Sequence, residues 1–223
     1  MYVKQLSHFI LKRFLLSMVL LSQILFFSLS LNAEENVVEN IQADPSVIIK
    51  SATTSMIEQL TINKKEIAED QSIVMNIVEG LLIPHFATNT ISRKVMGKHS
   101  RKATKEQKTQ FAEAFRFYMV RFYSKVFAAY SNQTFKYLPA PEFIGKKRVT
   151  IKTQLIQSGS KPVAIDYKMQ RSGDSWKIVD LKIEGISMVI SNKKQFGNQI
   201  GIDGLDTVIA KLQYKNNKAK TNE

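Results

Sequence analysis

Residues 176–196, WKIVDLKIEGISMVISNKKQF, determine how the sheet meets the helices, because they join a strand to a helix through an apolar corner. Its first half has the composition of a β-strand, and Glu184 and Gly185 mark a turn. Ser187 then caps a helix that we expect to end near residue 199. The corner holds no histidine or cysteine that would point to catalysis, so we expect it to border an apolar cavity.

The strand that opens this stretch does not alternate cleanly. Trp176 and Ile178 share one parity. The other parity is taken by Val179, Leu181 and Ile183. One face of a strand cannot hold both sets, so the sequence predicts either a β-bulge or a strand covered on both faces.

Upstream residues place this strand in a sheet. Apolar and polar residues alternate over residues 149–155 and again over residues 163–170, and residues 133–137 supply a possible edge strand. We therefore expect an antiparallel sheet of about four strands within residues 133–183, with one apolar face. The opposite face is expected to carry Lys152, Lys168 and Gln170.

Residues 44–130 are predicted to be helical, and one long helix carries the strongest pattern. Thr104 and Gln107 form a capping box at its start. One face carries aromatic and aliphatic residues at a spacing of three or four, namely Phe111, Phe115, Tyr118, Phe122, Val126 and Ala129. Additional aromatic residues widen this stripe, namely Tyr123, Phe127 and Tyr130. Either the helix is buried on two sides, or part of the stripe borders a void filled by a ligand.

The elements together predict an α+β protein. Long helices pack on one curved antiparallel sheet, with a helical subdomain before it and C-terminal helices over residues 187–213. The last of these helices is expected to be capped by Asp203. Methionine is frequent in the predicted helices and strands, which suits an irregular apolar pocket.

The first 33 residues have the features of a secretory signal peptide. Lys4, Lys12 and Arg13 precede an uncharged apolar run over residues 14–31, and Ala33 offers a small residue for cleavage. The run is also long enough for an uncleaved membrane anchor, although the serines within it disfavour that alternative. We therefore expect export and cleavage. The chain has no cysteine, which excludes a lipid-modified lipoprotein.

Residues 34–223 are expected to form a single domain with a basic surface. The chain has 32 Lys and Arg and 19 Asp and Glu, and three of the positive charges lie in the leader, so the mature charge is +10. This balance suits an anionic membrane surface, lipid headgroup or acidic protein. The aromatic residues cluster on the helical stripe and the basic residues lie elsewhere, so we do not expect a nucleic-acid partner.

Residues suited to catalysis or metal binding are sparse. His85 and His99 are the only histidines after the leader, and the sequence has no zinc-ligand spacing, nucleophile elbow or phosphate-binding loop. We therefore expect no metal site, no cofactor and no enzymatic activity.

Three stretches resemble one known family in order and spacing. Residues 81–130 resemble its proline-led helix and its aromatic helix, residues 176–200 its tryptophan strand and E-G-I-S corner, and residues 201–212 its G-I-D-G-L ending. The family is that of the MlaC-type periplasmic phospholipid carriers, also called toluene-tolerance auxiliary proteins. The resemblance spans about residues 44–212. His99 departs from the bulky aromatic residue that the family often has there.

The resemblance implies an NTF2-like sheet that, with a helical subdomain, encloses a deep pocket for acyl chains. It implies a monomeric periplasmic carrier that shuttles phospholipid between an outer-membrane lipoprotein–porin complex and an inner-membrane MCE-domain protein of an ABC transporter, supporting outer-membrane lipid asymmetry. Two alternatives remain open. One is a carrier of hopanoid or isoprenoid-type lipids, and the other is an NTF2-like enzyme that uses Asp166 or Asp180 on a small apolar substrate.

The lipid-contacting side chains are expected on the short helix after Pro84, the long helix, the sheet and the corner. They are Phe86, Val95, Met96, Phe115, Tyr118, Phe122, Tyr123, Ile165, Tyr167, Ile186 and Met188. Lysines near the pocket mouth are expected to attract phosphate through a screened interaction.

Overall fold

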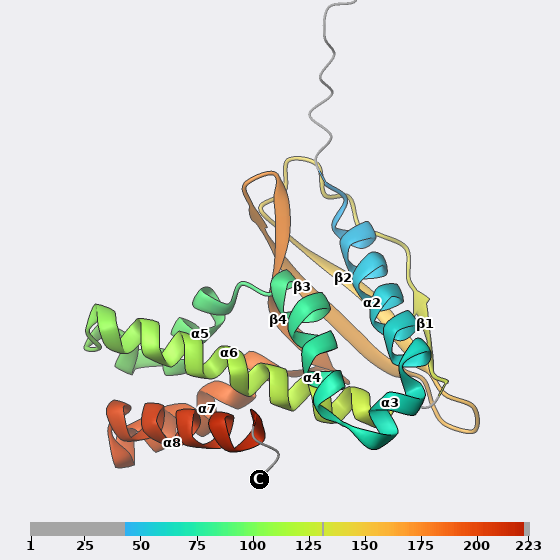
Figure 1. Cartoon of the computed structure of the whole chain (residues 1–223). Coiled ribbons are helices and arrows are strands. Elements are labelled where there is room, and N and C mark those ends of the chain that lie inside the picture. Colours follow the sequence, from blue (N-terminus) through green and yellow to red (C-terminus); the bar gives the residue numbers. More distant parts are fainter. Residues whose placement is uncertain (1–42, 131, 221–223) are drawn as a thin grey trace, which may run out of the picture. The chain divides into compact units, whose positions relative to one another are not determined.

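The computed structural model describes residues 43–130 and 132–220 (Figure 1). Its central element is an antiparallel sheet. The predicted signal peptide lies outside the described residues. The strands are β1 (Thr134–Tyr137), β2 (Arg148–Ile156), β3 (Val163–Ser172), β4 (Ser175–Ile183) and β5 (Ile186–Ser187). They pair in sequence order and antiparallel throughout. The expected meander is confirmed, and β5 adds a two-residue strand at its edge.

A β-bulge interrupts the pairing of β3 with β4. Lys168 pairs with Asp180 and Met169 pairs with Ile178, so Val179 is the extra residue on β4. This confirms the bulge that the broken alternation predicted. The inserted residue returns Trp176 to the side that carries Leu181, and both side chains are buried.

The two faces of the sheet differ in chemistry, as expected. One cross-strand row joins Thr153, Ile165, Ile183 and Ile186, which lie opposite one another in register. We call the face that carries this row the inner face. The next row along the strands joins Lys152, Asp166 and Lys182, which point to the opposite, outer face because side chains alternate along a strand.

Helices cover the inner face. The first elements of the chain are α2 (Pro45–Ile62), α3 (Lys64–Glu69), α4 (Ser72–Ile77), a π-helical turn η1 (Val78–Leu82) and a 3₁₀ turn η2 (Ile83–His85), and of these α2 and η2 contact the strands directly. Helix α2 packs on β2 and β4, and its Thr53 hydroxyl lies 2.7 Å from the Tyr137 hydroxyl of β1. Pro84 lies inside η2, where the α-helical run has already ended.

A second group of helices packs together beyond these turns. It contains α5 (Thr88–Met96), a short 3₁₀ turn η3 (Gly97–Arg101), α6 (Lys105–Ala128), α7 (Met188–Asp203) and α8 (Leu205–Lys220). Helix α5 contacts α6 and α7, and α8 contacts α6 and α7. Figure 1 shows α7 and α8 below α6, and α4 contacts α6 near the end that is drawn on the right. This group therefore combines the middle of the chain with its C-terminal end.

Local capping determines where several of these helices start. The Thr104 hydroxyl accepts from the Gln107 N–H and the Gln107 side chain accepts from the Thr104 N–H, which confirms the capping box of α6. The predicted cap at Asp203 is wrong. Helix α7 continues through Asp203, and Gly204 ends it with a φ of 81°, a conformation that glycine adopts at no steric cost. Helix α8 then extends past residue 213.

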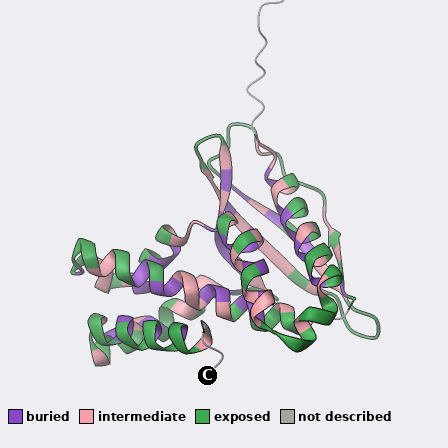
Figure 2. Ribbon diagram, viewed as in Figure 1, coloured by how far each residue is buried: buried purple, intermediate pink, exposed green. Residues whose placement is uncertain are grey.

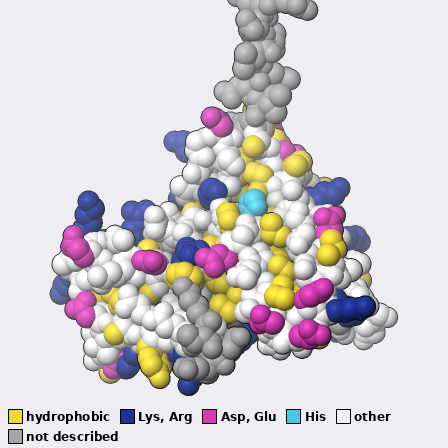
Figure 3. All heavy atoms as spheres, viewed as in Figure 1, with side chains coloured by type: hydrophobic (Ala, Val, Ile, Leu, Met, Phe, Trp, Pro, Cys, Tyr) yellow, Lys and Arg dark blue, Asp and Glu magenta, His cyan; other side chains and the backbone are white. Residues whose placement is uncertain are grey.

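The core runs continuously from the inner face of the sheet through η1, η2 and α6 to α7 and α8. Figure 2 shows buried residues along α6 and on the strands, with exposed residues on the outer surfaces of α7 and α8. On the face drawn in Figure 3, apolar side chains gather in the middle of the described part of the chain, and most charged side chains lie around them.

Candidate functional site

The corner between β4 and α7 is a two-residue hairpin turn. Glu184 and Gly185 both have positive φ, 49° and 78°, and they connect the paired residues Ile183 and Ile186. A turn with positive φ at both central residues matches the twist of a β-hairpin. The Glu184 N–H donates to the Ala164 carbonyl at 2.9 Å, and the Ala164 N–H donates to the Glu184 carboxylate. The turn thereby presents Ile186 to solvent, with 59% of its surface exposed.

A buried polar pair attaches this corner to β4. The Ser187 hydroxyl donates to the Asp180 carboxylate, with both oxygens at 2.8 Å. The same hydroxyl oxygen accepts from the Ile190 N–H at 3.1 Å, and Asp180 also accepts from the Val189 N–H at 3.2 Å. The predicted helix cap at Ser187 is therefore confirmed. Asp180 and Ser187 each accept one N–H group of the first turn of α7, so the pair supports the start of this helix.

The aromatic stripe of α6 meets α7 through Phe196. The Phe196 ring lies edge-on to the rings of Phe111, Phe115 and Tyr118, with centroid distances of 6.2, 5.7 and 5.2 Å. The stripe continues from Tyr118 to Phe122, whose rings are 6.3 Å apart. Phe122 is 38% exposed, so the stripe leaves the core at this point.

The other side of α6 reaches the sheet through Tyr123. Its ring lies 5.5 Å from that of Phe86, and Phe86 forms a bridge with Ile178 of β4. Burial, and then the neighbouring Tyr167 hydroxyl of β3, raise the pKa of Tyr123. Burial raises the pKa of Tyr167 to about 12. Both phenols therefore stay neutral at physiological pH and provide an amphipathic but uncharged region between α6 and the inner face.

The structure places the eleven predicted lipid-contacting residues in three environments. Six are buried in the core, namely Phe86, Val95, Met96, Phe115, Tyr123 and Tyr167. Three are half-buried against it, namely Tyr118, Ile165 and Met188. Phe122 and Ile186 are exposed. Ring contacts connect the α6 residues to the sheet through Phe86. Strand pairing places Ile165 beside Ile183 and Ile183 beside Ile186. Val95 and Met96 lie apart from both sets, on α5 where it packs on α6 and α7. Their role in lipid contact stays a prediction.

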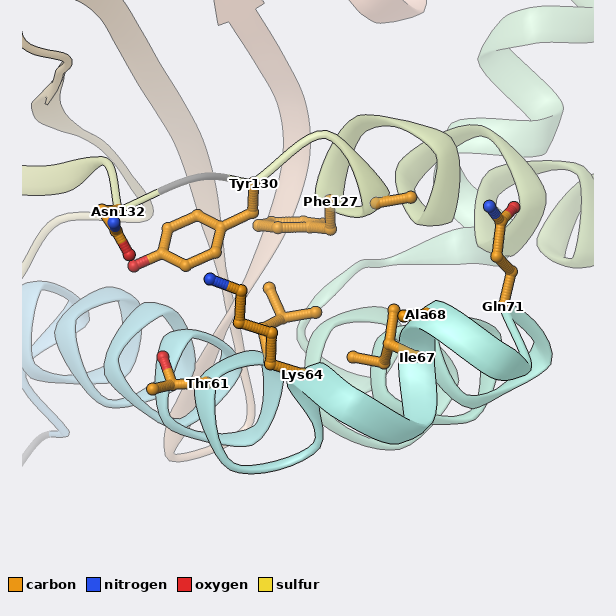
Figure 4. A pocket seen from close by; sticks show the side chains of 10 residues that line it. Thr61, Lys64, Ile67, Ala68, Gln71, Phe127, Tyr130 and Asn132 are labelled. Carbon is orange, nitrogen blue, oxygen red and sulfur yellow. The ribbon is translucent and has the colours of Figure 1, made fainter.

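One hollow, of about 320 Å³, lies where α2 and α3 meet the end of α6. Figure 4 shows Lys64 reaching from α3 toward Tyr130, with Phe127 and Ile67 on the surrounding walls. Two aromatic residues that widened the sequence stripe, Phe127 and Tyr130, thus border a void as well as the core.

A larger hollow, of about 550 Å³, lies beside the β4 bulge. Its charged lining residues are Lys94, Arg148, Lys168 and Asp180. Its remaining lining comes from β2, β3 and β4 and from the first turn of α7. Sequence reasoning identified Lys168 only as an outer-face residue and missed Lys94 and Arg148, because three different elements supply the basic residues.

The carboxylates considered for catalysis lie on β3 and β4. Asp166 and Asp180 point to the outer face, opposite Ile165 and Tyr167. Within residues 43–130 and 132–220, no group of three or more His, Cys, Asp or Glu side chains is placed to hold a metal ion. Across the same residues, no helix combines the length and apolar character needed to cross a bilayer.

Comparison with known families gives a match over most of the chain. The family model described as MlaC protein matches residues 50–214, which include every helix and strand from α4 to α7. The MlaC intermembrane phospholipid transport system binding protein of Haemophilus influenzae is 25% identical over 175 residues, covering 77% of this chain and 82% of that protein. A toluene tolerance protein of Pseudomonas putida is 26% identical over 163 residues, covering 73% of this chain and 75% of that protein.

A solved structure shares the fold. The phospholipid-binding protein of Ralstonia solanacearum, determined in complex with a phospholipid, matches with a TM-score of 0.70 and 24% sequence identity. The match covers 79% of this chain and 98% of that chain. The sheet, its covering helices and the α5–α8 group therefore belong to one known architecture.

Proposed function

Because this chain belongs to the MlaC protein family, we propose that it is a phospholipid-binding carrier of an intermembrane lipid transport system. The family match over residues 50–214 carries this proposal, since it contains both the aromatic α6 and the corner after β4. Relatives that cover most of the chain bear phospholipid-transport and toluene-tolerance names. The Ralstonia solanacearum protein of the same fold holds a phospholipid.

The exposure of apolar residues at the corner supports the proposal. Ile186 and Ile190 are 59% and 68% exposed on either side of the Ser187 cap, and Phe122 and Val126 are exposed on one face of α6. Large apolar side chains left in water are candidates for covering by a ligand or partner. We place the acyl chains against the α6 residues and the inner-face row that ends at Ile186.

A lipid carrier must bind its lipid about as favourably as the bilayer does, so that it can both take up and release it. Removing an acyl chain of about 16 carbons from water stabilises the bound state by about 13 kcal/mol, at about 0.8 kcal/mol per CH₂ group. The acyl chain comes from a bilayer, where it is already shielded from water. The net free energy of its transfer is therefore close to zero when the binding site is as apolar as the bilayer. Partner proteins can then determine the direction of transfer by small differences in affinity.

A periplasmic location is part of the proposal. The predicted leader and membership in this family support a periplasmic location. Transfer between an outer-membrane lipoprotein–porin complex and an inner-membrane MCE-domain ABC transporter follows from the family resemblance. The words "intermembrane phospholipid transport system" in the name of the Haemophilus influenzae relative support the same placement.

Extraction of the native ligand tests the function. The full chain is expressed with its leader, and the protein is purified without detergent and extracted with organic solvent. The extracted lipids are quantified by mass spectrometry. We expect diacyl phospholipid at close to one molecule per protein. Isoprenoid-type lipid at that level would instead identify the alternative carrier, and absence of lipid together with turnover of a small apolar compound would favour the enzyme.

A further inference from the structure

Three basic side chains from three elements converge on the hollow beside the β4 bulge. Lys94 comes from α5, Arg148 opens β2, and Lys168 lies in β3. Thr150 pairs with Lys168, so Arg148, two residues before Thr150, is a diagonal neighbour of Lys168 on the outer face at about 7 Å between Cα atoms. The Lys94 ammonium donates to the Val179 carbonyl at 3.4 Å, which brings it to the bulge. We call this space the Lys94–Arg148–Lys168 hollow.

The positive charge in this hollow is only partly balanced. Asp180 is the single carboxylate among its lining residues, against three cations. That carboxylate already accepts from Ser187 and from the Val189 N–H, and it lies 3.8 Å from the Lys168 ammonium. Burial, and then repulsion by Arg148, lower the pKa of Lys94, and the Asp180 carboxylate offsets part of this effect.

The remaining walls suit an amphipathic anion. Apolar residues line the hollow beside the cations, namely Val179, Val189 and Ile190, together with Val149 and Met169, whose side chains point to the inner face. Its volume of about 550 Å³ lies within the range of about 300–1,000 Å³ typical of small-molecule sites. The 16-residue helix α7 begins at this wall, and the positive end of its dipole adds to the field of the side chains.

We propose that the Lys94–Arg148–Lys168 hollow binds the phosphate group of an amphipathic phosphate ester. Arg148 provides a planar set of donors for the phosphate oxygens, and the two ammonium groups neutralise its charge. The phosphate belongs either to the headgroup of the carried phospholipid or to a separate small phosphate compound. The anion site stands on the hollow itself, and only its assignment to the headgroup rests on the proposed carrier function.

Titration of lipid-free, ¹⁵N-labelled protein tests the site. The probes are inorganic phosphate and dihexanoylphosphatidylglycerol below its micelle concentration, followed by amide chemical shifts. We expect saturable shifts at residues that line the hollow, such as Thr150, Val179 and Ile190. The K94Q/R148Q/K168Q variant should weaken the apparent affinity at least tenfold.

A matched variant controls for net charge. K65Q/K161Q/K215Q removes the same charge from exposed positions outside the hollow and should keep the affinity within twofold. Equal weakening in the two variants, or shifts scattered over exposed lysines in the wild type, would overturn the proposal.

Lipid-loaded protein distinguishes the two sources of phosphate. If inorganic phosphate no longer shifts the amides of the hollow in loaded protein, the headgroup occupies it. If the shifts persist, the hollow takes a separate phosphate compound. Lipid content is measured on the same samples, so a protein that binds phosphate in the hollow but never carries lipid would refute the carrier function and leave the anion site intact.

Discussion

The Ser187 hydroxyl lies 2.8 Å from both carboxylate oxygens of Asp180, and this contact fixes the start of α7 to β4. The N–H groups of Val189 and Ile190 are satisfied by the same two side chains. A helix start of this kind would otherwise leave N–H groups without partners next to the core. The direction of the chain after the corner is therefore set by a buried polar pair as well as by apolar contacts.

Replacement of Ser187 by Ala should lower the free energy of unfolding by about 1–3 kcal/mol. The variant loses a helix cap, worth about 0.5–2 kcal/mol, and removes a donor from the buried Asp180 carboxylate. Urea denaturation followed by circular dichroism measures the loss. Ser191→Ala, at an exposed position of the same helix, should change stability by less than about 0.5 kcal/mol. Equal losses in the two variants would contradict the role of the Asp180 contact.

Replacement of Phe196 by Leu should destabilise the α6–α7 contact by about 1–3 kcal/mol. Phe196 makes edge-on contacts with three rings of α6, and Leu keeps the apolar character but loses the ring geometry and part of the volume. The midpoint of thermal or urea unfolding reports the effect. Tyr214→Leu changes an exposed aromatic residue of α8 and is the matched control. A Phe196→Leu variant as stable as this control would show that the ring contacts contribute little.

Local signals in the sequence account for most of the fold. The capping box at Thr104, the cap at Ser187 and the alternation of β2 and β3 are encoded within a few residues, and each is confirmed. The bulge was one of two predicted alternatives, and only the pairing of Lys168 with Asp180 and of Met169 with Ile178 identifies the inserted residue.

Features that depend on distant residues were not predictable. Asp203 has the residue type of a cap, yet α7 extends through it because Gly204, one residue later, takes the positive φ that ends the helix. The Lys94–Arg148–Lys168 hollow unites residues from three elements, and no spacing in the sequence reveals such convergence. The apolar stripe of α6 was evident, but which of its members are buried depends on where Phe196 and Phe86 meet it.

Acidification should destabilise the protein through His85. Burial, and then the Lys177 ammonium, lower the pKa of His85, and that ammonium donates to the carbonyl of the preceding residue Pro84 at 2.7 Å. The folded state therefore binds a proton less readily than the unfolded state, in which histidine titrates near about 6.5. The contribution of His85 to stability is complete above that pH and is lost as the pH falls below it.

His85→Gln removes this dependence without adding a charge. Unfolding free energies measured between pH 7.5 and 5.5 should fall less in the variant than in the wild type. The same slope in both proteins would assign the acid sensitivity to other groups.

Introducing a carboxylate at the apolar corner tests where the lipid lies. Ile186 is 59% exposed, so Ile186→Glu should leave the fold intact in the empty protein. If acyl chains cover this residue, they would bury the new charge, which is strongly unfavourable. Phospholipid recovered per protein molecule should then fall at least tenfold.

Met188→Glu, on the first residue of α7, should act in the same direction. Ile202→Glu adds the same charge at an 83% exposed position near the other end of α7, and this control should keep its lipid. Circular dichroism verifies folding in all three, and a folded Ile186→Glu variant with wild-type lipid content would place the acyl chains elsewhere.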